Sequence, residues 1–323
     1  FHDGICGCHI DAVYTDLMRE MEEIKKISEG KIMQSFSKII PSGKKEKIVV
    51  FNTNFWEREE IVKMEGKEDI VVFENKKLLK TQNYKGDTYF YVKIPPFGYK
   101  VLDFKKGKSK EKVINKKKQL ENFKFENENY VIKTEGNQLK IKAKFLKYPV
   151  FEERNFGEIL FREDRGDLWK ENFFGIIMGS KYENERIKEI RQGDVLTSFL
   201  IEGEAEKGKE GFLHGDFWDG FESLRWKKEF IFPEKERRFI LKVKIEWRGR
   251  NTKVMLCFPT KIDPLKGKAI YEIPFGSIER LPYYEVDFKW SKKIKKFGQY
   301  VYSTSKGDWP AVNSVSYTHL TLP

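Results

Sequence analysis

Short runs rich in β-branched and aromatic residues recur from residue 47 to residue 258, separated by polar turns and with no helical pattern between them. Such runs are typical of β-strands. Because parallel strands need crossover connections that are usually helical, their absence favours antiparallel sheets over a βαβ fold. The clearest runs are residues 47–51, 69–73, 88–94, 130–133, 139–142, 239–245 and 254–258. The sequence therefore predicts a mainly β fold whose larger part is an antiparallel β-sandwich.

The first forty residues have a different, helical pattern. Apolar residues recur there at helical spacing, with charged residues on the other side: Ile10, Val13, Tyr14, Leu17, Met21 and Ile24. This spacing predicts one amphipathic helix, which we expect to end at Gly30. A second apolar stretch through Phe36 stops at Pro41, because proline does not continue a helix.

Composition shifts divide the chain into five parts. We expect a helical segment at 1–41, a small β-domain at 42–104, a basic linker at 105–117 and a large β-sandwich at 118–313. The linker is strongly basic and lacks apolar periodicity. Residues 314–323 break the pattern and are interpreted as an artefactual tail, so His319 is expected to have no function.

Charge and cysteine content restrict the function classes. Of 323 residues, 62 are Lys or Arg and 50 are Asp or Glu, but the surplus is mostly Lys scattered among Glu, without an Arg-rich stripe or a nucleic-acid-binding motif. No apolar stretch is long enough to span a membrane. Three cysteines make no disulfide framework and no N-glycosylation sequon occurs. We therefore expect neither a nucleic-acid nor a membrane partner, and a cytoplasmic location.

The first ten residues concentrate groups that can bind a metal. His2, Asp3, Cys6, Cys8 and His9 lie immediately before the predicted helix. Imidazole, thiolate and carboxylate are zinc ligands, so a self-contained site is one alternative, although Cys-x-Cys-His matches no usual structural zinc spacing. Packing or capping at the helix start is another interpretation of His2.

The same segment resembles a family motif. Phe1-His2-Asp3, followed by Gly7, Ile10, Val13 and Tyr14, is similar to the FHD-x-x-x-G-x-x-I-x-x-V-Y segment of glycoside hydrolase family 38, the retaining α-mannosidases, in members of bacterial type. Cys8 departs from the Ser or Thr that is usual there. Further segments resemble this family in its order: residues 49–60, 94–102, 120–122, 129–132, 163–169, 245–247, 257–259 and 271–280.

The resemblance implies the C-terminal part of such an enzyme, without its N-terminal catalytic barrel. The helical segment would be a remnant of a three-helix bundle. The implied reaction is retaining hydrolysis of terminal α-mannosyl residues of oligosaccharides or glycans by two carboxylates, with Zn²⁺ holding mannose hydroxyls. His2 would bind the zinc and Asp3 would contact the sugar. The nucleophile, the acid and the other zinc ligands would lie in the N-terminal domain, so we expect this chain alone to be inactive.

The resemblance also suggests weaker candidates for the sugar pocket. Asp164, Asp167 and Trp169 lie in an acidic turn that combines carboxylates with an aromatic ring, and Arg280 follows Glu279. A solvated acidic turn and an Arg280–Glu279 pair are the alternatives.

Other motif residues have structural interpretations. Asn52 and Gly98 are expected to fix turns, and Trp56 and Trp247 to pack between sheets. A non-catalytic carbohydrate-binding or structural β-sandwich module is the alternative for the whole chain. A homo-oligomer is a further option.

Overall fold

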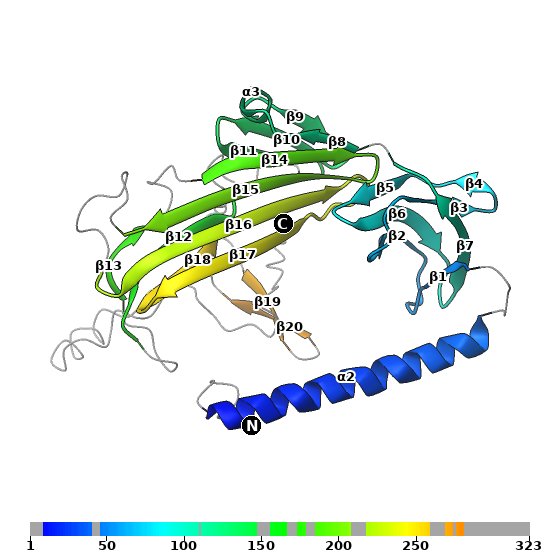
Figure 1. Cartoon of the computed structure of the whole chain (residues 1–323), viewed down its shortest axis with the longest axis horizontal. Helices are drawn as coiled ribbons and strands as arrows, with labels where there is room; N and C mark the ends of the chain where they lie inside the picture. The colour runs from blue at the N-terminus through cyan, green and yellow to red at the C-terminus, as the bar shows by residue number, and fades with distance from the viewer. Residues whose placement is uncertain are drawn as a thin grey trace.

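The computed structural model describes residues 9–40, 46–109, 111–146, 156–166, 173–178, 185–207, 218–258, 269–273 and 276–280. Strands predominate in these ranges, and every pairing between them is antiparallel (Figure 1). The predicted mainly β, antiparallel fold is therefore confirmed. No helix within these ranges is long and apolar enough to cross a membrane.

The N-terminal helix α2 (Asp11–Ile39) lies apart from the sheets along most of its length (Figure 1). The prediction that it ends at Gly30 is wrong. Glycine costs about 1 kcal/mol relative to alanine inside a helix, which the good helix formers around it can outweigh. The helix ends where the amide of Ile40 donates to Phe36 O at 2.9 Å, just before Pro41. Near this end the Phe36 ring stacks on Phe51 at 3.8 Å between centroids.

Two sheets form the small β-domain. One has the order β1 (Ile48–Phe51), β7 (Tyr99–Lys106), β3 (Ile70–Glu74), β4 (Lys77–Leu78), and the other has the order β2 (Arg58–Met64), β6 (Asp87–Ile94), β5 (Thr81–Tyr84). Apolar residues from both sheets share one core, which includes Val72, Leu102, Phe90 and Val92.

A five-stranded sheet is the centre of the large domain. Its order is β17 (Ile240–Gly249), β16 (Phe221–Pro233), β15 (Leu196–Glu206), β14 (Glu185–Gly193), β8 (Glu111–Ile114). The other elements are α3 (Lys117–Leu120), β9 (Lys124–Glu126), β10 (Tyr130–Glu135), β11 (Gln138–Ala143), β12 (Glu158–Asp164), β13 (Phe173–Met178), β18 (Thr252–Cys257), β19 (Ala269–Ile273) and β20 (Gly276–Arg280). Strands β11-β10-β9 and β13-β12-β18 form three-stranded sheets, and β19-β20 a two-stranded one.

One face of the five-stranded sheet packs on both three-stranded sheets. Phe199 and Phe230 share a buried cluster with Ile132 of β10, while Trp226 shares a second cluster with Phe161 of β12. This arrangement is the expected sandwich. Strand β16 alternates buried and exposed residues at 225–228, but 230–233 are buried throughout. The small β-domain covers the second face at that end, because Tyr84 packs on Ile231 there.

The stretch predicted as a basic linker contains a strand. Residues 111–114 form β8, which pairs with the end of β14, from Ile190↔Ile114 to Gly193↔Glu111. The side chain of Ile114 is buried, whereas Lys112 is exposed. In this edge strand, Ile114 is thus the one residue that is buried, within a charged stretch. Such a pattern is too short to give a periodicity signal in the sequence.

Candidate functional site

The predicted metal ligand and sugar contact, His2 and Asp3, lie outside the described residues. The first described residue is His9, whose ring stacks on Tyr14 at 5.6 Å between centroids. Neither of its ring nitrogens has a hydrogen-bond partner. Among the described residues, no group of three or more His, Cys, Asp or Glu side chains could hold a metal ion. The part of the chain that is described therefore does not supply a zinc site by itself.

The acidic turn is described only at its start. Glu163 is buried at the end of β12 and forms an ion pair with Arg165. Asp164 Oδ1 accepts a hydrogen bond from the amide of Gly166 at 2.9 Å. Asp167 and Trp169 lie outside the described residues. Both described carboxylates thus stabilise the turn locally, and their role toward a sugar stays a prediction.

Arg280 is the last residue of β20, where it pairs with Ala269. Its side chain is outside the described part, as are Asp167 and Trp169. The grouping of Arg280 with Asp164 in a sugar pocket therefore stays a prediction.

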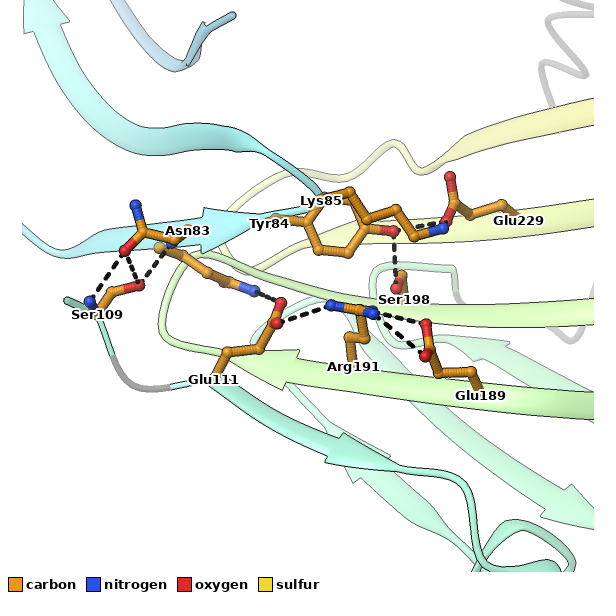
Figure 2. Close-up of polar contacts among 10 residues, drawn as sticks. Asn83, Tyr84, Lys85, Ser109, Glu111, Glu189, Arg191, Ser198 and Glu229 are labelled. Carbon is orange, nitrogen blue, oxygen red and sulfur yellow. Dashed lines mark hydrogen bonds and ion pairs between the residues drawn. The ribbon is translucent and has the colours of Figure 1, made fainter. Parts of the chain in front are cut away.

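A buried polar cluster joins the small β-domain to the five-stranded sheet (Figure 2). The hydroxyl of Tyr84 donates to Glu229 Oε1 at 2.7 Å and lies 2.9 Å from Ser198 Oγ. Lys85 forms an ion pair with the same carboxylate. The two domains therefore meet through a phenol, a hydroxyl and a salt bridge.

Gln82 extends this cluster along β5. Its side-chain oxygen accepts hydrogen bonds from the amides of Val195 and Leu196, at 3.1 and 2.8 Å. Its amide nitrogen donates to Glu111 at 3.4 Å, and Glu111 in turn pairs with Arg191 at 3.1 Å. We call the whole set the domain joint: Gln82, Tyr84, Lys85, Glu111, Arg191, Ser198 and Glu229.

The charges of the domain joint are balanced. Burial raises the pKa of Tyr84, so the phenol stays a hydrogen-bond donor. Burial alone would raise the pKa of Glu229, but hydrogen bonds from Lys85 and Tyr84 outweigh it and lower that pKa. The hydrogen bond to Glu189 raises the pKa of Arg191. Because each charged group faces an opposite charge, the joint has the chemistry of a structural contact rather than of an acid–base site.

A second buried ion pair lies inside the sandwich. Lys228 Nζ donates to Gly157 O at 2.8 Å and pairs with Glu185 at 2.6 Å. Trp226 Nε1 donates to the same carboxylate oxygen at 2.7 Å. Burial lowers the pKa of Lys228, although Glu185 acts in the opposite direction. These contacts tie the first residue of β14 to the centre of the sheet.

A hollow of about 140 Å³ lies on the open face of the five-stranded sheet. Its lining consists of Arg186, Lys188, Glu202, Gly203, Glu204, Arg225, Trp226, Lys227, Lys244 and Glu246. The carboxylates pair with neighbouring cations, as in Lys227–Glu202 at 2.8 Å and Lys244–Glu246 at 2.9 Å. The lining contains no histidine, cysteine or hydroxyl side chain. The nucleophile types that it does contain, carboxylates and lysine amines, are held in ion pairs with neighbouring residues.

Two predictions for individual motif residues have opposite outcomes. Asn52 is buried, and its amide nitrogen donates to Trp56 O and Pro95 O at 2.8 and 3.0 Å, which confirms that it fixes a turn. Trp56 is 50% exposed, so the prediction that it packs between sheets is wrong. The residues of the domain joint were not singled out in the sequence, because contacts such as Tyr84–Glu229 and Gln82–Val195 link positions more than 100 residues apart and follow no motif.

No protein-family model matches the chain, and neither does any curated protein. Two solved structures from Enterococcus faecalis are similar to it. One, a protein in the glycosyl hydrolase family 38, shares 15% identity at a TM-score of 0.63, covering 87% of this chain and 41% of its own. The other, an alpha-mannosidase from strain V583, shares 14% identity at a TM-score of 0.62, covering 87% of this chain and 39% of its own. The chain therefore shares its fold with about two-fifths of each.

Proposed function

We propose that the chain is part of a zinc-dependent, retaining α-mannosidase of glycoside hydrolase family 38 that hydrolyses terminal α-mannosyl residues of oligosaccharides or glycans. The observation that carries this proposal is the agreement of two features. The motifs resemble those of that family and occur in the same order along the chain. The fold is similar, over 87% of the chain, to a solved structure described as a glycosyl hydrolase family 38 protein and to one described as an alpha-mannosidase.

His2 and Asp3 are the residues of this chain that we assign to the reaction. His2 would contribute one imidazole to the zinc ion, and Asp3 would bind hydroxyl groups of the mannose. The ion would supply charge and orientation to the sugar hydroxyls when bound. Following the family resemblance, we assign the remaining ligands and both catalytic carboxylates to the N-terminal domain of such an enzyme.

The exposed face of α2 supports a partner of this kind. Large apolar residues line one side of the helix and are more than 40% exposed: Ile10, Val13, Tyr14, Leu17, Met21, Ile24, Ile32 and Ile39. A helix with such a stripe gains most of its stability from packing that stripe against another element. We propose that the rest of the same enzyme, including the other helices of the three-helix bundle, covers it.

The experiment is a His2→Ala substitution in the complete enzyme. We expect loss of bound zinc and a fall of at least about 100-fold in the rate of hydrolysis of a nitrophenyl α-mannoside. Changing even a residue that only supports a metal ligand commonly costs about 10–100-fold in metal affinity or activity. His9→Ala is the matched control and should retain both zinc and activity. The proposal is refuted if His2→Ala keeps its zinc and its rate. Loss of zinc only in His9→Ala would instead favour the self-contained cysteine–histidine site.

A further inference from the structure

Three aromatic rings are exposed where two loops of the small β-domain meet. Phe55 and Phe97 are each 73% exposed and Trp56 is 50% exposed. Phe55 and Trp56 are adjacent in sequence and lie between β1 and β2, whereas Phe97 lies between β6 and β7. The amide of Phe97 donates to Asn54 O at 2.9 Å, which joins the two loops. We call Phe55, Trp56 and Phe97 the aromatic tip.

Asn52 holds the backbone of both loops in place. Its side chain donates to Trp56 O on its own loop and to Pro95 O on the other, and its oxygen accepts from the amide of Asn54 at 3.1 Å. Its own amide donates to Gly98 O at 2.8 Å. A Cβ on Gly98 would lie 2.6 Å from Pro95 Cγ, so the close approach requires glycine. The rings are thus presented by a fixed backbone, which reduces the entropy lost on binding.

Phe97 has an unfavourable backbone conformation for its residue type. Its φ is +43°, in the left-handed region, where glycine or asparagine is normally found. Since its ring is 73% exposed, packing within the described residues returns little stabilisation for this strain. Strain of this kind clusters at binding sites, so it makes Phe97 a candidate for a binding role.

The size of the aromatic tip indicates what binds to it. With about 150–250 Å² per aromatic side chain, the three rings expose on the order of 400 Å², about half of the ~800 Å² that one partner buries in a stable protein complex. The ring planes of Phe55 and Trp56 are 87° apart, so they do not form one flat surface. Glu57, the residue after Trp56, pairs with Lys93 at 2.7 Å, and their side chains are 52% and 63% exposed.

We propose that the aromatic tip is a carbohydrate-binding surface. The apolar C–H face of a pyranose ring would stack on an exposed ring, and Glu57 and Lys93 would exchange hydrogen bonds with its hydroxyls. The exposed area is large enough for one or two sugar rings. A sugar has an apolar face surrounded by hydroxyl groups, which suits exposed aromatic rings that are accompanied by a charged pair. This proposal does not rest on the hydrolytic function, since it concerns binding by the chain itself.

The test is a ligand-observed saturation-transfer NMR titration of the chain with mannotriose, cellotriose and maltotriose. At ~10 mM sugar, at least one trisaccharide should receive magnetisation on its ring C–H protons, as expected for a Kd near the millimolar range. Trp56→Ala and Phe97→Asn should each weaken that binding by about tenfold or more. Asparagine tolerates the left-handed region, so the second variant removes the ring and keeps the loop folded. Leu78→Ala, at another exposed apolar residue of the same domain, should bind like the wild type.

Two outcomes overturn the proposal. One is that no trisaccharide binds, or that both aromatic-tip variants bind as the wild type does. The other is that the chain self-associates in solution and that Trp56→Ala and Phe97→Asn each abolish the dimer, which would make a second copy of the chain the occupant. Because no hydrolysis is measured, either result leaves the assignment of His2 untouched.

Discussion

The domain joint and the apolar stripe of α2 are both surfaces of one chain, but only the first is complete. At the joint, Gln82, Tyr84 and Ser198 are buried and hydrogen-bonded to partners in the other domain. On α2, residues such as Leu17 and Met21 remain exposed, and none of the helix residues is buried. The difference teaches that buried contacts hold the two β-domains together, whereas the apolar side of the helix is exposed in the described part of the chain.

The largest effect is expected at Gln82, which has no solvent exposure. Gln82→Ala leaves the amides of Val195 and Leu196 buried without their acceptor, so we expect the free energy of unfolding to fall by about 3 kcal/mol. Urea denaturation measures this change. Gln138→Ala, at an exposed position of β11, should stay within about 0.5 kcal/mol of the wild type. Equal effects of the two substitutions would show that the joint contributes no special stability.

A smaller loss is expected at Tyr84. Tyr84→Phe removes the hydroxyl that donates to Glu229, and should lower the free energy of unfolding by about 1–2 kcal/mol. Lys85 still pairs with that carboxylate, which limits the loss. Tyr14→Phe on the exposed helix is the comparison, and its unfolding midpoint should not move. If Tyr84→Phe left the free energy of unfolding unchanged, the account of the joint would be contradicted.

The aromatic tip should respond in the opposite direction. Phe97→Gly removes the strain of a positive φ and should raise the free energy of unfolding by about 1 kcal/mol, partly offset by the greater freedom of glycine in the unfolded chain. Thermal denaturation followed by circular dichroism measures this gain. A loss of stability would mean that the ring packs within the domain and would weaken the case for a binding surface.

The smallest effect is expected on the stripe of α2. Leu17→Gln exchanges an exposed apolar side chain for a polar one of similar helix propensity, so the free energy of unfolding of the chain should change by less than about 0.5 kcal/mol. Phe36→Ala, which removes the ring stacked on Phe51, should instead loosen the end of the helix. A large loss in Leu17→Gln would show that the stripe is already packed in the chain alone.

Local patterns predict much of this fold. The predicted run 88–94 lies within β6, and the run 47–51 matches β1 except for its first residue. Asn52 fixes a turn, as its place after a strand suggests. What local patterns leave out depends on contacts distant in sequence. The end of α2 depends on the whole helix rather than on Gly30, β8 is defined by its pairing with β14, and Trp56 is exposed because Asn52 holds its backbone at a loop.

The candidate site divides in the same way. The metal-ligand prediction rests on His2 and Asp3, where a motif carries the information and no structure is described. The domain joint has no motif, because a phenol such as Tyr84 and a carboxylate such as Glu229 are common residues that become significant only once they are 2.7 Å apart. The aromatic tip has a sequence signal, since Phe55 and Trp56 follow a polar turn, but the sequence alone favours burial for such residues.

Hydrogen–deuterium exchange of α2, compared between the chain alone and the complete enzyme, tests the central claim most directly. The account predicts that the amides of residues 11–39 exchange rapidly in the chain and are strongly protected in the enzyme, while β5 and β15 at the domain joint are equally protected in both. Equal exchange of α2 in the two proteins would contradict the claim that the helix packs against the rest of the enzyme.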